Sequence, residues 1–158
     1  MIINYKMTEH FILRIGDYEN NFTNSVINTD NKVWGYKVMY NNLHERMVTH
    51  GYVFYLSNNM NKNGRIVGYS KISNERETQE NANEEHQWTN ANMFGNTTWT
   101  RKWDVVDYID LYDMNINTRQ INEYDNSRIS QSSLHRITST NRPNLYNTLT
   151  ELVNNVNN

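Results

Sequence analysis

The 158-residue sequence predicts an α+β fold with a strongly curved β-sheet or barrel at its centre. Short runs of β-branched and aromatic residues recur along the chain, and such runs are typical of strands. Helical spacing of apolar residues follows each of the first two runs and returns near the end of the sequence. The resulting order is strand, helix, strand, helix, several strands and a final helix.

Five runs predict the strands of this sheet, at residues 10–14, 32–39, 52–56, 66–72 and 104–112. The third and fourth form the strongest hairpin pattern, because a turn-rich segment separates two β-branched and aromatic runs. We expect these two strands to pair antiparallel near the middle of the sheet. In the fifth run aspartates alternate with apolar residues, which predicts one face exposed to solvent.

Three segments predict helices. Residues 17–25 place Tyr18 and Phe22 on one helical face, and residues 41–48 predict a crossover with Met47 directed inward. Residues 143–153 predict a terminal helix that begins with proline and carries an apolar stripe. We expect this helix to close one end of the sheet.

Composition indicates a single domain spanning residues 1–158. The chain has one proline and no Gly/Ser linker, and its 12% aromatic share supplies buried area that its 29 asparagines do not. Asparagine enrichment of this kind is typical of an A/T-rich genome. The polar stretches 73–98 and 117–133 predict no regular element, and a loop as long as the first is usually functional or disordered.

Charge and cysteine content exclude several classes of function. With 15 basic and 17 acidic side chains the net charge is −2, so any contact with nucleic acid must be local. The absence of cysteine excludes disulfides and thiol catalysis. Residues 1–6 are too polar and too few for a signal peptide, and no apolar run has the length of a membrane span. We therefore expect an intracellular protein, cytoplasmic or nuclear, with no membrane partner.

Catalytic and metal-binding patterns are missing from the sequence. It contains no glycine-rich phosphate loop, no G-x-S-x-G elbow and no H-E-x-x-H pair. The five histidines lack the spacing of metal ligands, and the glutamates of residues 75–85 are expected to be solvated. The sequence thus predicts a protein that is not an enzyme and has no cofactor and no metal.

The tryptophans carry the strongest functional pattern. Trp34 precedes Gly35, whose missing side chain lets a ligand approach the backbone. Phe94 and Trp99 lie at the end of the long polar stretch, where packing alone explains aromatic residues less well. The simpler alternatives are a core position for Trp34 and a contact that fastens the loop for the other two rings. Trp103, which opens a predicted strand, is expected to pack in the core.

Three motifs carry a resemblance to a known family. Val33–Trp34 follows the first predicted helix, and Phe94 and Trp99 lie five residues apart ahead of Trp103–Asp104–Val105. The segment 126–131 reads Asn-Ser-Arg-Ile-Ser-Gln and is the most specific match. Together with the order of elements through nearly the whole chain, these motifs resemble a YTH domain. YTH domains belong to the PUA-like superfamily, as EVE domains do.

The resemblance implies a PUA-like curved sheet or barrel flanked by helices, and a reader of N6-methyladenosine in single-stranded RNA. It implies a modified-base cage formed by Trp34, Phe94 and Trp99, where Phe94 occupies a position at which the family usually has tryptophan. A side chain of the first helix is placed to hydrogen-bond a ring nitrogen of the base, and backbone groups to bond its exocyclic N–H. The residues expected in these two roles are Asn20 or Asn21, and Gly35.

Phosphate contacts are expected from a few local cations, since the overall charge is unfavourable. The resemblance implies this role for Arg128, and Arg14 stands where the family has lysine; Lys102 and Arg119 are further candidates. We expect a monomer. Two alternatives stay open: an EVE-like reader of another modified base, including one in DNA, and a PUA-like fold kept as a structural or host-interaction protein, for example a compact viral protein.

Overall fold

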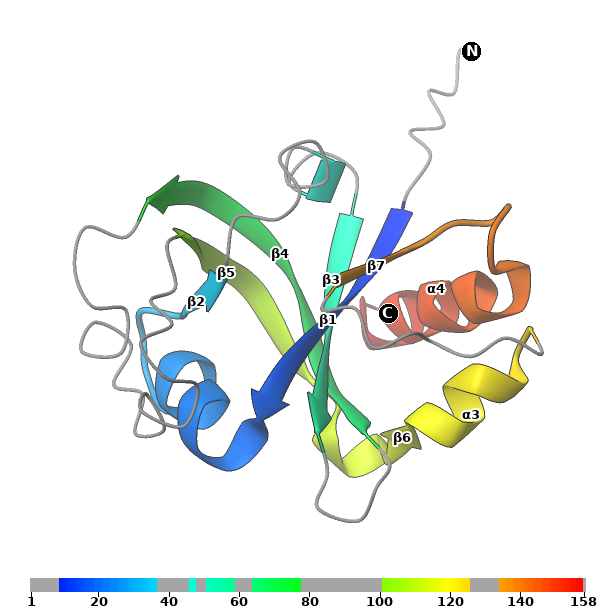
Figure 1. The fold of residues 1–158 in the computed structure, drawn as a ribbon, viewed down its shortest axis with the longest axis horizontal. Helices are drawn as coiled ribbons and strands as arrows, with labels where there is room; N and C mark the ends of the chain where they lie inside the picture. Colours follow the sequence, from blue (N-terminus) through cyan, green and yellow to red (C-terminus); the bar gives the residue numbers. More distant parts are fainter. Residues whose placement is uncertain are drawn as a thin grey trace.

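A curled mixed sheet forms the centre of the fold in the computed structural model, which describes residues 9–36, 46–47, 51–58, 64–77, 101–125 and 134–157 (Figure 1). Its strands are β1 (Glu9–Asp17), β2 (Val33–Tyr36), β3 (Gly51–Asn58), β4 (Arg65–Glu77), β5 (Arg101–Asp110), β6 (Ile116–Asn117) and β7 (Leu134–Ile137). The strand order is β2-β5-β4-β3-β1-β7, and β6 pairs with β4. The sheet bends into a half-barrel, which agrees with the predicted α+β fold with a strongly curved sheet.

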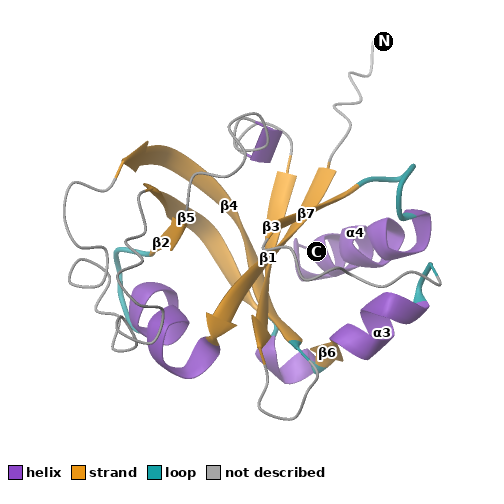
Figure 2. Cartoon of the chain, viewed as in Figure 1, coloured by secondary structure: helices purple, strands orange, loops and turns teal. Residues whose placement is uncertain are grey.

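The helices lie on opposite faces of this sheet (Figure 2). The π-helix η1 (Tyr18–Ile27) follows β1 directly and packs on one face. The 3-10 helix η3 (Tyr112–Met114) follows β5. The helices α3 (Thr118–Glu123) and α4 (Pro143–Asn157) cover the other face.

Strand β1 separates two hydrophobic cores because it is buried on both faces. Phe11 and Leu13 point into a first core under η1, whereas Ile12 points into a second core under α4. The strand pairs in parallel with β3 and antiparallel with β7. A near-continuous apolar run is expected for such a strand, and residues 11–13 and Ile15 are all less than a tenth exposed.

Each core collects side chains from distant parts of the chain. The buried residues of the first core are Phe11, Leu13, Ile15, Phe22, Val26, Trp34, Met47, Val53, Tyr55, Val67, Ile72, Trp103 and Val105. Those of the second core are Ile12, Phe54, Leu56, Ile66, Tyr69, Leu111, Ile121, Ile137, Leu145, Leu149 and Val153. The first core fills the concave side of the curl, next to β2.

Two irregular positions bend β4 and β5 around the first core. Asn74 and Asp107 have φ of 51° and 54°, in the left-handed region that Asn and Asp tolerate better than most residues. The register of the two strands shifts close to both positions, as at β-bulges. The Asn74 side chain donates a hydrogen bond of 2.9 Å to a carboxylate oxygen of Asp104, which fixes the bend near β2.

His10 links β1 to α4 on the opposite face. One ring nitrogen, Nε2, lies 2.8 Å from the Thr150 hydroxyl, and the ring centroid lies 5.0 Å from that of Tyr146. Burial lowers the pKa of His10 to about 4, so the ring is neutral at pH 7. A neutral histidine of β1 therefore makes this contact with α4.

The strands predicted at residues 10–14, 52–56 and 66–72 are confirmed, and the hairpin of β3 and β4 lies in the middle of the sheet. Of the strand predicted at 32–39, residues 33–36 form β2, and residues 37–39 lie outside the described residues. The helices predicted at 17–25 and 143–153 are also confirmed as η1 and α4. Of the predicted crossover 41–48, only Arg46 and Met47 lie within the described residues, and Met47 is buried. Trp103 is 1% exposed, which confirms its expected packing role.

Other boundaries differ from the prediction. Residues 73–77 belong to β4, because pairing with the start of β5 continues past the bulge. Helix α3 lies in a stretch predicted to contain no element, although Asn117 and Gln120 form a capping box there. Strand β7 was also not predicted. Helix α4 covers a face of the sheet and does not close its end, since its buried stripe meets the second core.

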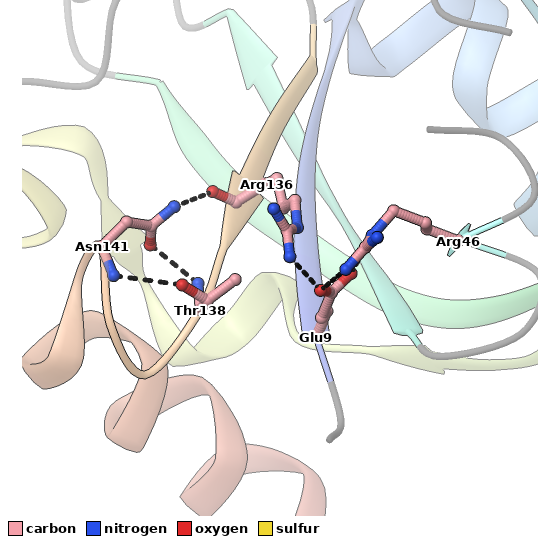
Figure 3. A network of polar contacts seen from close by, with 5 residues as sticks. All are labelled: Glu9, Arg46, Arg136, Thr138 and Asn141. Carbon is pink, nitrogen blue, oxygen red and sulfur yellow. Dashed lines mark hydrogen bonds and ion pairs between the residues drawn. The ribbon is translucent and has the colours of Figure 1, made fainter. Parts of the chain in front are cut away.

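An ion pair network between the buried Glu9 and two partly exposed arginines joins the start of β1 to two other segments (Figure 3). The Glu9 side chain is 2% exposed, and its carboxylate accepts hydrogen bonds from Arg46 and Arg136. The Arg46 Nε lies 3.0 Å from the second carboxylate oxygen, so this pair is bidentate. The hydrogen bond from Arg46 is the main reason why the pKa of Glu9 falls to about 2, and Arg136 adds to it.

We predict that Glu9→Gln lowers the free energy of unfolding at pH 7 by about 1–3 kcal/mol, because two arginines lose a charged partner. The wild-type carboxylate stays ionised in the folded state down to about pH 2, whereas the unfolded chain takes up the proton near its ordinary pKa of 4.5. The stability from Glu9 is therefore full above pH 4.5 and is lost as the pH falls towards 2. Urea unfolding at a series of pH values measures both effects.

The matched control is Glu123→Gln, which removes an exposed carboxylate paired with Arg119 at 3.5 Å. An exposed pair of this kind contributes little, so we expect a change below about 1 kcal/mol. A Glu9→Gln variant as stable as the control, with the same acid dependence as the wild type, would contradict the role of this network.

Candidate functional site

Trp34 lies at the edge of the sheet in a pair of buried indoles. Antiparallel pairing of β2 with β5 sets Trp34 opposite Trp103, so both side chains point to the first core. Their exposed fractions are 4% and 1%. Trp34 therefore lies in the first core, which is the simpler alternative considered for this residue.

Phe22 of η1 holds the Trp34 ring in place. The two ring centroids lie 5.3 Å apart at an interplanar angle of 60°, an edge-on contact. Phe22 also contacts Tyr55 of β3 at 5.1 Å, and the Tyr55 hydroxyl shares a hydrogen bond of 2.8 Å with Ser70. Burial raises the pKa of Tyr55 to about 12, so it is neutral at physiological pH. The Trp34 ring thus has an uncharged aromatic support behind it.

The role of Phe22 and Tyr55 as supports was not predicted. Phe22 was expected to share one helical face with Tyr18, and its position four residues after Tyr18 was the available indication. The contact with Trp34 depends on tertiary packing between η1 and β2, which no local pattern encodes.

The residues expected to hydrogen-bond the base lie on the two elements that meet at Trp34. Asn20 and Asn21 are in η1, one turn or less from Phe22, and their side chains lie outside the described part of the structure. Gly35 follows Trp34 on β2, is buried, and pairs with Lys102 of β5. The fold therefore brings the backbone positions of all three into the neighbourhood of β2 and η1.

The other two expected cage residues, Phe94 and Trp99, lie outside the described residues, as does Arg128. The two anchors of the segment that carries the rings are nevertheless described. Strand β4 ends at Glu77, which pairs with Arg101 at the start of β5, and Arg101 also pairs with Tyr36 of β2. Arg101, directly after the segment 78–100, therefore lies beside the strand that carries Trp34, whereas Glu77, directly before that segment, is one strand further away.

Two of the candidate cations, Arg14 and Arg119, lie away from Trp34, whereas Lys102 pairs with its neighbour Gly35. Arg14 pairs with Leu56, a residue of the second core, so the half-buried Arg14 side chain points to the opposite face of the sheet. Burial lowers its pKa. Lys102 is 8% exposed, and Arg119 lies on α3, also over the second core.

The described ranges 9–36, 46–47, 51–58, 64–77, 101–125 and 134–157 contain neither a metal-binding cluster nor a membrane-spanning helix. No three histidine, aspartate or glutamate residues of these ranges are placed to hold a metal ion. No helix among them is both long enough and apolar enough to cross a membrane.

We predict that Trp34→Ala lowers the free energy of unfolding by about 3–5 kcal/mol, because it removes a buried indole from the first core. Trp34→Phe keeps an aromatic ring against Phe22 and should cost clearly less. Urea unfolding measures both. The control Tyr124→Ala removes a ring that is 37% exposed and should change stability little. A Trp34→Ala variant with a midpoint equal to the control would show that Trp34 is not a core residue.

Comparisons with known proteins identify the fold. No protein-family model matches the sequence, and no curated protein matches it. Among solved structures, the YTH domain of the Zygosaccharomyces rouxii MRB1 protein, in complex with N6-methyladenosine RNA, matches with a TM-score of 0.56. The match covers 96% of this chain and 89% of that chain at 15% sequence identity. The curled mixed sheet with its flanking helices is therefore a YTH-like α+β fold.

Proposed function

We propose that this protein is a non-enzymatic RNA-binding protein that reads N6-methyladenosine in single-stranded RNA. The observation that carries the proposal is the position of Trp34 on β2, the strand that pairs with the start of β5, directly after the segment that contains Phe94 and Trp99. The structure with the similar fold was solved with N6-methyladenosine RNA, which supports an RNA ligand. We further propose that residues 1–158 form one domain that acts as an intracellular monomer.

Covalent geometry supports Trp99 as a second cage wall. Trp99 precedes Arg101 by two residues, so their Cα atoms are at most about 8 Å apart. Arg101 pairs with Tyr36, two residues from Trp34 on the same strand. Phe94 lies five residues before Trp99 in the sequence. We assign Trp34, Phe94 and Trp99 as the three rings around the base.

The chemistry of such a cage explains methyl selectivity. Aromatic stacking contributes roughly 1–3 kcal/mol per base, and a methylamino group gives up less hydration than a free amine when it enters an apolar box. The supports behind Trp34 are uncharged, so they do not favour a cationic ligand. Asn20 or Asn21 would bond a ring nitrogen of the base, and the Gly35 backbone its exocyclic N–H.

Base entry requires rearrangement around Trp34. At 4% exposure the indole has little free surface, so the side chains that cover it must move aside before a base can stack. Association coupled to such a change is slower than simple docking. Because Arg14 points to the face of the sheet opposite Trp34, we propose the phosphate contact for Arg128, and with a net charge of −2 we expect moderate, salt-sensitive affinity.

The test is a fluorescence anisotropy titration with four oligonucleotides of one sequence: methylated and unmethylated, each as RNA and as DNA. We predict at least about 10-fold tighter binding of the methylated RNA, which corresponds to ~1.4 kcal/mol. Equal preference in the DNA series would favour a reader of modified bases in DNA. The absence of any methyl preference would contradict the reader function and favour a structural or host-interaction role.

A matched pair of variants separates the cage from the core. Trp34→Phe and Trp103→Phe each shorten a buried indole at directly opposed positions of β2 and β5. We expect both to lower stability, and only Trp34→Phe to reduce the preference for methylated RNA. If Trp103→Phe reduced it equally, the loss would reflect general damage to the first core.

A further inference from the structure

A second group of flat side chains reaches the surface at the end of the sheet where η1 begins. The Arg65 guanidinium carbon lies 4.6 Å from the centroid of the Tyr112 ring. Tyr112 stacks on Tyr18 with centroids 4.7 Å apart and an interplanar angle of 21°. All three side chains are partly exposed. We call Arg65, Tyr112 and Tyr18 the stacked column.

The stacked column is held by the framework of the fold. Arg65 is the first residue of β4, Tyr112 opens η3, and Tyr18 opens η1. The Tyr112 backbone N–H donates a 3.1 Å hydrogen bond to the Asp110 carboxylate, which fixes the turn after β5. The positions of the three planes are thus set by three separate elements.

The column is continuous with the aromatic support of Trp34. Tyr18 contacts Phe22 with centroids 5.9 Å apart, and Phe22 in turn contacts Trp34. Arg65 forms the end of the column that is farthest from Phe22. A single strand whose methylated base lies at Trp34 therefore needs only a few further nucleotides to reach Arg65.

Arg65 combines a stacking plane with available donors. Among the described residues, no carboxylate pairs with its guanidinium, and its contact there is with the Tyr112 ring. A guanidinium laid on an aromatic ring is a surface on which nucleobases stack, in single strands especially. A structural ion pair would be expected to direct the same group at a carboxylate.

We propose that the stacked column binds an unpaired nucleobase of the RNA strand, outside the cage. The inference rests on the proposed RNA-binding function for the identity of the strand, and its own test does not depend on methylation. The base would stack at the Arg65 end of the column.

Nearby carboxylates determine whether the stacked column contacts a phosphate or the face of a base. Partial burial raises the pKa of Tyr18, and the carboxylates of Asp110 and Asp113 raise it further. Negative charge therefore lies beside the column. Carboxylates disfavour a phosphate close to Tyr18. The contact is therefore with the face of a base, and its contribution should depend little on salt, unlike that of phosphate contacts.

The experiment is an abasic scan of the RNA. In a single-stranded oligonucleotide, each nucleotide flanking the central adenosine is replaced in turn by an abasic residue, and binding is measured by anisotropy. We expect one flanking position at which loss of the base weakens binding by roughly 5- to 100-fold, the range of base stacking. The scan is run on methylated and unmethylated strands.

Variants at Arg65 identify the stacking partner. We expect the loss of affinity at that abasic position to disappear in Arg65→Gln and Arg65→Lys, because both variants lose the guanidinium plane. Only Arg65→Lys keeps the positive charge. Lys71→Gln is the control: it removes the same charge from β4, where Lys71 lies over Tyr52 at 5.4 Å, and should keep the penalty. Tyr112→Leu, which removes the ring beneath Arg65, should act as Arg65→Gln does.

Each outcome decides the proposal. A position whose penalty survives in all column variants, or no sensitive flanking position at all, overturns it, and a full penalty in Arg65→Lys would show that charge alone matters. An Arg65-dependent penalty without methyl preference leaves the column in place and removes the cage. Methyl preference without the penalty does the reverse.

Discussion

Burial of β1 on both faces is the constraint on which the rest of the structure depends. One side of the strand supplies Phe11, Leu13 and Ile15 to the first core, and the other supplies Ile12 to the second. The strand also pairs with β3 and β7, and its end leads without a loop into η1. A shift of one residue would exchange these side chains between the two faces and lose both sets of contacts. The position of η1 follows directly from this register.

The candidate site is linked to β1 through η1. Because η1 starts directly after β1, Phe22 meets both Trp34 at the sheet edge and Tyr55 beneath it. Trp34 therefore contributes to the core and is also the expected first wall of the base cage. Strong support holds a stacking ring rigid, which lowers the entropic cost of binding. If the proposed cage forms, stability and recognition share one side chain.

Much of the sheet could be predicted from sequence, because its central strands are long and rich in β-branched and aromatic residues. The C-terminal helix was equally clear from its apolar stripe. Strand β7 was missed, since four residues with a histidine and an arginine carry no strong period. The bulges at Asn74 and Asp107 interrupt the alternation of apolar and polar residues from which strand boundaries are predicted. Burial of Glu9 could not be foreseen, because its two arginines come from distant parts of the chain.

The residue types of the candidate site could be predicted from the sequence, but their arrangement in space could not. Sequence singled out Trp34 and Gly35, and the fold places them on β2 beside the start of β5, which follows the segment 78–100. Arg14, in contrast, lies on the other face of the sheet, because the residue that faces it across the strand pair belongs to the second core. Which face a residue of a doubly buried strand occupies depends on tertiary register, and composition does not encode it.

The most direct measurement of the central claim is the set of nuclear Overhauser effects from the N6-methyl protons of a bound methylated RNA. The methyl group has few neighbours, so each contact identifies a wall of the pocket. The account predicts contacts to the indole protons of Trp34, together with ring protons of Phe94 and Trp99. Methyl contacts confined to other side chains, with none to Trp34, would contradict it.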